Sequence, residues 1–349
     1  MKKILVLLTL WCWIINPKIV VAKNPSVGFQ GEVVEILEEK EIEVMEKKQW
    51  YQKLVVESLD KSQKVEIENG NDALANVVKY QVGDQVVVNT EEEAYIVDFV
   101  RSKALVWLVI IFVGLLIAVA GSREAWSLLA MGVTFLVVFW FMLPRILAGD
   151  NPVVIAILSS LFIIPVTFYM SHGVNRKTTI AIIASVITLI IAAILGWIFI
   201  KLGYLTGLSS EEAGMLALDK SNLQMRGVLL AGMVIGALGV LDDITVSQSA
   251  IVEELATTAG LKKARDLYNR SMVVGKDHIT SMVNTLVLAY AGAAMPLMLI
   301  FVNNPHPFGE IINYEMIAEE IIRTLVGSIA LILAVPISSF IAANWKRES

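Results

Sequence analysis

The sequence is poor in cysteine, histidine and charge. Of its 349 residues, one is cysteine and three are histidine, and charged residues make up only 17%. The cysteine, Cys12, lies in an apolar N-terminal stretch, so the rest of the chain can form neither a disulfide nor a cysteine-ligated metal site. The net charge of −5 argues against a nucleic-acid-binding surface. The chain also lacks a P-loop, an HExxH zinc motif and an acyl-transfer triad, so we expect no enzymatic activity, and no cofactor is indicated.

The first 22 residues have the form of a secretory signal peptide. Lys2 and Lys3 provide a positive start, Ile4–Ile15 is apolar, and Val20-Val-Ala22 offers small residues before a cut after Ala22. An uncleaved signal anchor is the alternative interpretation. A signal peptide would send the rest of the N-terminal region across the membrane.

Residues 23–100 are rich in polar residues and alternate with a period of two, as half-buried strands do. They predict a small extracytoplasmic all-β domain, a barrel or sandwich of the OB kind. Such a domain can bind a ligand or serve as a spacer or assembly module. The expected strands are Gly31–Leu37, Glu41–Met45, Gln52–Ser58, Val65–Glu68, Asp84–Asn89 and Ala94–Asp98.

Residues 101–349 predict an α-helical polytopic membrane domain of about seven transmembrane helices, because they repeat apolar runs of roughly 20 residues. Pro144, Pro165, Pro296 and Pro336 are expected kink points. The expected spans are Ala104–Ala120, Ala125–Leu147, Pro152–Met170, Thr178–Leu202, Gly227–Val246, Ile279–Val302 and Ile317–Asn344.

Loop charges predict the orientation of these spans. The loops after the first, third and fifth spans and the C-terminus hold most of the lysine and arginine, including Arg123, Arg176, Lys262 and Lys346. Cytoplasmic loops carry such an excess. We therefore expect a multi-pass protein of the plasma membrane with its C-terminus in the cytoplasm and its β domain outside.

The fifth span combines a glycine stripe with two adjacent acids. Gly232, Gly236 and Gly239 share one helix face with Asp243, and small residues at this spacing let a neighbouring helix approach. Asp242 and Asp243 are costly inside hydrocarbon, and such acids mark ion paths, proton relays or buried pairs. The alternative is that both acids sit in the headgroup region at the end of the helix.

The sixth span begins with polar residues that would lie at a similar depth if the two helices pack. Asp277, Asn284 and Thr285, with the two acids of the fifth span, offer hard oxygen ligands for a small cation. His278 can relay a proton or simply begin the helix, and Gly292 is a further packing glycine. Asp277 can also complement the helix dipole, and Asn284 can join helices.

The segment Ala250–Gly275, between these two spans, is amphipathic. It is expected to lie on the inner membrane surface or dock a cytoplasmic partner, or else to be a solvated connecting helix.

Four motifs in order carry a family resemblance: Leu208–Leu216, Gly236–Asp243, Gly275–Gly292 and Glu320–Gly327. Together with Val82-Gly-Asp84 they resemble the YibE/F-like family of multi-spanning membrane proteins, over nearly all of the chain after the signal peptide. The resemblance implies a membrane topology and supplies no substrate. It also implies an acid in the fifth span followed by small and hydroxyl residues, a place that Asp242 or Asp243 fills.

These patterns favour a permease or permease subunit, coupled to a cation or proton. Its partners would be the lipid bilayer and a second copy or second membrane subunit. The alternative is a non-transporting adaptor or sensor, whose β domain detects a signal outside and whose Ala250–Gly275 segment contacts a partner inside.

Overall fold

A computed structural model describes residues 28–45, 47–71, 77–90, 93–121, 125–220, 222–261, 263–302 and 306–345. The predicted signal peptide and Cys12 lie outside these residues. The described chain forms two compact units that divide between Ala120 and Gly121. The helix that contains the first expected span, α2 (Ser102–Ala120), belongs with the β domain in the first unit.

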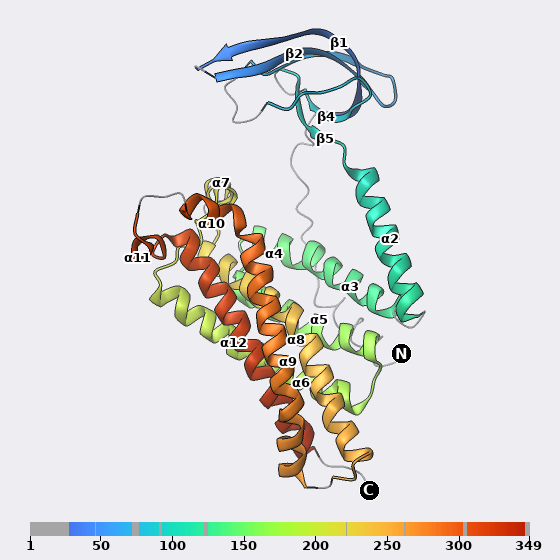
Figure 1. The fold of residues 1–349 in the computed structure, drawn as a ribbon, viewed down its shortest axis with the longest axis vertical. Coiled ribbons are helices and arrows are strands. Elements are labelled where there is room, and N and C mark those ends of the chain that lie inside the picture. Colours follow the sequence, from blue (N-terminus) through green and yellow to red (C-terminus); the bar gives the residue numbers. More distant parts are fainter. Residues whose placement is uncertain are drawn as a thin grey trace. The chain divides into compact units, whose positions relative to one another are not determined.

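Five antiparallel strands form the β domain, in the spatial order β3-β2-β1-β4-β5 (Figure 1). They are β1 (Gly28–Val44), β2 (Lys47–Ser58), β3 (Lys64–Asn69), β4 (Gln85–Asn89) and β5 (Tyr95–Phe99). The sheet curls until β3 and β5 lie close together, which makes a partly open barrel, as predicted. The first two expected strands, Gly31–Leu37 and Glu41–Met45, belong to a single strand in the structure, because β1 continues through residues 38–40. Its register shifts, between Val33 and Glu35 and between Ile36 and Glu38, are bulges that bend a strand.

The barrel has its own core, formed by inward residues of alternating strand positions such as Val33, Leu54 and Val86. A buried glutamine, Gln52, fastens the loop before β4 to this core. Its Nε2 donates to the Tyr80 carbonyl oxygen at 2.9 Å, and the Tyr80 N–H donates to its Oε1 at 2.8 Å. Gln52 thus satisfies both backbone groups of a residue that belongs to no strand.

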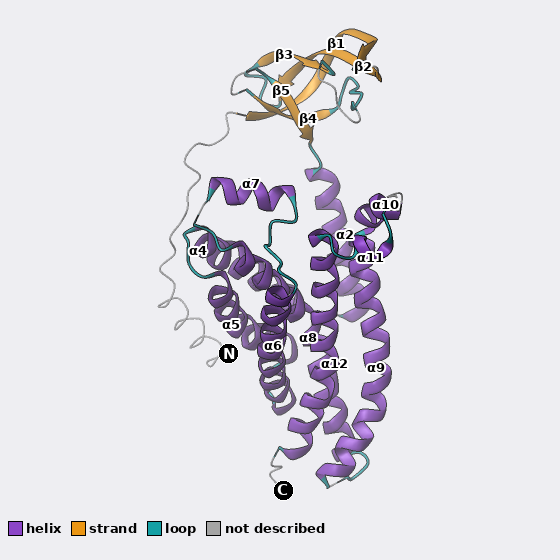
Figure 2. Ribbon diagram, turned by 90° about the vertical axis from the view of Figure 1, so that its left-hand side faces the viewer, coloured by secondary structure: helices purple, strands orange, loops and turns teal. Residues whose placement is uncertain are grey.

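The second unit is a helical bundle whose long helices are shown in Figure 2. Its helices are α3 (Ala125–Val137), the π-helical turn η2 (Val138–Met142), α4 (Leu143–Leu147), α5 (Pro152–His172), α6 (Arg176–Leu202), α7 (Glu211–Asp219), α8 (Met225–Thr257), α9 (Ala264–Ala293), α10 (Met295–Val302), α11 (Phe308–Ile311) and α12 (Glu315–Asn344). Six helices in the part of the chain that the structure describes, counting α2 of the first unit, are long and apolar enough to span a membrane. The pair α9 and α10 makes a seventh span if its 67° bend is counted within one crossing. The predicted architecture of about seven long apolar helices is thereby confirmed, and the break falls beside Pro296, an expected kink point.

At the centre of the bundle α6, α8 and α12 pack against one another, and α9 packs mainly on α12. The segment Ala250–Gly275 is not a separate surface helix. It consists of the ends of α8 and α9 and a short turn, and its Val252 and Leu267 are buried with Ile180 of α6 and Ala342 of α12. The fifth and sixth spans are therefore longer than predicted and form one helical hairpin.

Candidate functional site

The acidic pair of the fifth span sits on α8, where Asp242 lies beside the last residue of α5. Its Oδ1 is 3.8 Å from Nε2 of His172, and the two side chains are 35% and 39% exposed. This Oδ1 is buried and accepts no hydrogen bond from the described residues. Asp243 is exposed. Asp242 and His172 thus form a half-buried acid–imidazole pair whose attraction depends on protonation of the histidine.

Three of the predicted site residues on α9, namely Asp277, Asn284 and Thr285, face away from the helices that α9 packs on. Its buried residues are Leu267, Ser271 and Gly275. Asp277 and Asn284 stand about 200° and 180° from Gly275 at 100° per residue, and both are exposed. Thr285 is also exposed and donates to the Ser281 carbonyl oxygen at 3.0 Å. Half-buried His278 has a buried Nδ1 without a hydrogen bond among the described residues.

The structure does not gather these acids into a metal cage. Within the described ranges, no three histidine, cysteine or acidic side chains lie close enough to hold a metal ion. Asp242 has His172 as its neighbour, while Asp277 points outward from α9.

Two of the predicted packing glycines leave room for polar side chains. A Cβ on Gly232 would lie 3.6 Å from Nη1 of Arg323, and one on Gly236 would lie 3.0 Å from the hydroxyl of Tyr290. Nothing described lies within 4 Å of such an atom on Gly239 or Gly292. The glycine stripe therefore contacts the side chains of Arg323 and Tyr290, and no neighbouring backbone packs closely against it in the described structure.

The close approach of α8, α9 and α12 occurs further toward the α8–α9 turn, at Gln248. This buried amide donates from Nε2 to the Ser271 carbonyl oxygen at 3.0 Å and to Oγ of Ser339 at 2.7 Å. A Cβ on Gly275 would lie 3.0 Å from the same Nε2 and 2.5 Å from Cγ1 of Val335. Gln248 thus joins three helices where Gly275 lets them meet.

A cluster of charges lies near the other end of α12. Arg323 donates from Nη2 to Oε1 of Glu319 at 2.5 Å, and its Nε is 3.2 Å from Oε2 of Glu320. Glu319 is only 12% exposed and also accepts from Oγ of Ser209 at 2.5 Å. Two carboxylates against one guanidinium leave an excess of one negative charge. The three-residue spacing of Glu320 to Arg323 and the four-residue spacing of Glu319 to Arg323 are visible in the sequence and favour ion pairs on one helix face, but only the structure shows that Glu319 is the more buried acid.

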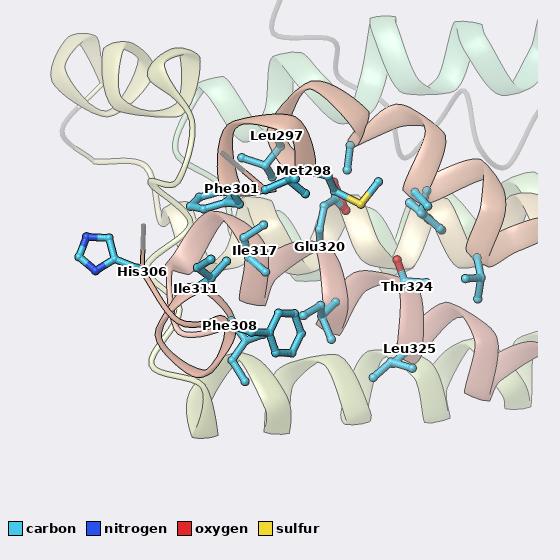
Figure 3. A pocket seen from close by; sticks show the side chains of 17 residues that line it. Leu297, Met298, Phe301, His306, Phe308, Ile311, Ile317, Glu320, Thr324 and Leu325 are labelled. Atoms are coloured by element: carbon cyan, nitrogen blue, oxygen red, sulfur yellow. The ribbon is translucent and has the colours of Figure 1, made fainter. Parts of the chain in front are cut away.

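A groove of about 680 Å³ opens beside this cluster, between α9, α10, α11 and α12 (Figure 3). Its walls are almost entirely apolar and include the aromatic side chains of Tyr290, Phe301 and Phe308. Glu320 is the one acid among its lining residues, and Figure 3 shows its carboxylate beside Met298. His306 stands at the edge with its ring directed away. The groove combines an apolar volume of ligand size with a single charged group.

Comparison with known proteins places this bundle in a family. Curated proteins and solved structures give no match. The model of the YibE/F-like protein family matches residues 108–348. The match begins within α2 and leaves out the β domain, so the resemblance covers less of the chain than its motifs suggested. It spans well over half of the sequence and contains every helix of the bundle. The chain therefore belongs to the YibE/F-like family.

Proposed function

We propose that this protein is a permease, or the membrane subunit of one, that moves a solute across the plasma membrane with coupling to a proton or cation. The observation that carries the proposal is the Glu319–Arg323–Glu320 cluster, which lies in the first three turns of the apolar helix α12, close to the break between α9 and α10. Charges inside membrane spans mark substrate or ion paths. Transporter binding sites are commonly built at discontinuous helices.

A second polar layer, at Asp242 and His172, supports proton coupling. Gly232, beside Arg323, and Asp242 are separated by about 15 Å along α8 at 1.5 Å per residue. The stretch of α8 between them, from Met233 to Leu241, contains no charged residue. We therefore assign solute binding to the outer layer and proton exchange to the inner one, where the His172 imidazole lies 3.8 Å from the Asp242 carboxylate and both groups can carry a proton.

The exposed polar face of α9 supports assembly into an oligomer. Asp277 and Asn284 have no hydrogen-bond or ion-pair partner among the described residues, and lipid cannot supply one. An asparagine amide both donates and accepts, so it can pair with its own counterpart in a second copy. In this proposal Asn284 and Ser281 line the contact between two copies, and Asp277 lies at its inner end.

Growth of a strain that lacks the gene, over a panel of metal ions and pH values, tests the transport proposal. The wild-type gene should restore growth under at least one condition, and Asp242→Asn should shift the pH range of that rescue. Glu253→Gln, an exposed acid on the same helix, is the matched control and should rescue as the wild type does. Rescue by a well-expressed Asp242→Asn variant at every pH would contradict proton coupling at this residue.

The alternative function, an adaptor or sensor, is favoured by the β1–β2 ribbon. Residues 40–44 of β1 pair with β2 and with no other strand, and Met45 and Trp50 at this end are exposed. Such a ribbon can contact another protein. In a test variant, this end of the ribbon is removed and the two shortened strands are joined by a two-residue turn. The variant should still transport if the protein is a permease, and it should be inactive if the protein is a sensor.

A further inference from the structure

The groove between α9, α10, α11 and α12 carries an inference about the solute. Most of its lining is aliphatic or aromatic, so an occupant must present an apolar body. Its volume of about 680 Å³ is within the usual range for small-molecule sites. A hydrophilic solute or a bare metal ion would make no favourable contact with most of this apolar surface.

The charge beside the groove selects the sign of the occupant. Glu319 is already bound to Arg323 and Ser209, and Glu315 accepts from the backbone N–H groups of Thr206 and Gly207. Glu320 is bound less completely. Only its Oε2 approaches Arg323, and its other oxygen has no partner among the described residues. The excess negative charge of the cluster therefore lies on the acid that faces the groove.

Two further features favour a cation. Tyr290, Phe301 and Phe308 present aromatic surface, which attracts organic ammonium groups. No lysine or arginine lines the groove among the described residues.

We propose that this groove binds an amphiphilic organic cation, whose positive centre pairs with Glu320 and whose apolar body fills the space between α9 and α12. Movement of the bound cation across the membrane rests on the proposed permease function, whereas binding itself does not. Lipid acyl chains are the competing occupant, and they would need no acid.

Binding of tetraphenylphosphonium to the purified full-length protein in nanodiscs tests the proposal, with tetraphenylborate as an anion of the same shape. We expect the cation to bind roughly tenfold or more tightly than the anion, as expected for one partly buried charge pair. Glu320→Gln should weaken cation binding by a similar factor. Glu211→Gln, an exposed acid of α7 that does not line the groove, should leave it unchanged.

A second pair of variants tests the position of the site without altering its charge. Ala291→Trp fills the groove and should abolish binding, whereas Leu288→Trp, exposed on the same helix outside the groove, should not. This pair keeps the proposal falsifiable if Glu320→Gln fails to fold. Equal binding of the two ions, or equal effects of the two tryptophans, would overturn it.

Transport measurements separate the two proposals. Cation binding that depends on Glu320, without transport of any solute, would leave the groove site standing and contradict the permease. Transport that is unaffected by both Glu320→Gln and Ala291→Trp would leave the permease standing and contradict the groove site.

Discussion

Replacing Gly275 by alanine is expected to destabilise the bundle, whereas the same change at Gly292 in the same helix is not. The new methyl group at Gly275 would lie 2.5 Å from Val335 and 3.0 Å from the Gln248 amide, so side chains or backbone must shift. At Gly292 nothing described lies within 4 Å. The two variants share the change in helix propensity and differ only in these contacts.

The magnitude is the sum of three contributions. Alanine in place of a helical glycine gains about 0.5–1 kcal/mol in both variants. Overpacking at Gly275 costs about 1–3 kcal/mol, and a weakened Gln248 hydrogen bond costs about 1 kcal/mol more. The unfolding free energies of the two variants should therefore differ by about 2–4 kcal/mol, or roughly 5–15 °C in Tm for a unit of this size.

Thermal unfolding in detergent, monitored by tryptophan fluorescence, measures this difference. Gly275→Ala should melt below the wild type and Gly292→Ala at or slightly above it. Equal melting temperatures for the two variants would show that α8, α9 and α12 do not meet at Gln248, and the reasoning about this junction would fail.

Three further predictions concern the β domain and the proposed oligomer. Gln52→Ala leaves the N–H and C=O of Tyr80 buried without partners, so a fragment of residues 28–101 should lose about 2–4 kcal/mol in urea unfolding; a change below about 0.5 kcal/mol would contradict this. Hydrogen bonds from Ser58 and Ser62 lower the pKa of Asp60 from 3.8 to about 2, so this carboxylate stabilises the fold above its unfolded pKa and loses the effect as the pH falls toward about 2. Asp60→Asn should therefore flatten the acid limb of the fragment's stability curve, and an unchanged limb would refute the assignment. In a Cys12→Ser background, Ser281→Cys on the outer face of α9 should crosslink two copies, while Met282→Cys on its packed face should not; equal crosslinking would argue against the α9 interface.

The membrane spans could be predicted because insertion into lipid depends on the composition of each segment. All seven expected spans correspond to helices, and the bend beside Pro296 results from the missing N–H of proline. The length of α8 and α9 could not be predicted in the same way. Beyond the apolar stretch their packing on α6 and α12, through Val252 and Leu267, decides whether the helices continue.

The sequence also could not predict which side of α9 packs against the rest of the protein. Its polar residues indicated a protein-facing side, but a polar face can meet the same chain, a second copy or water with equal ease. Gly275, which packs against Val335 and Gln248, decides the orientation and places Asp277 on the other side. The partner of Asp242 could not be predicted from the sequence either. His172 lies beyond the apolar run of its span, where hydropathy gives no signal.

The position of Gln248 within α8 has a mechanical consequence. About 18 Å of helix separates it from Gly236, and about 14 Å separates it from Thr257, where α8 ends. If the three helices rotate about the residue that ties them, the two arms are nearly equal in length. Gly236, which borders Tyr290 of the groove wall, lies on the longer arm, and the α8–α9 turn lies on the shorter one.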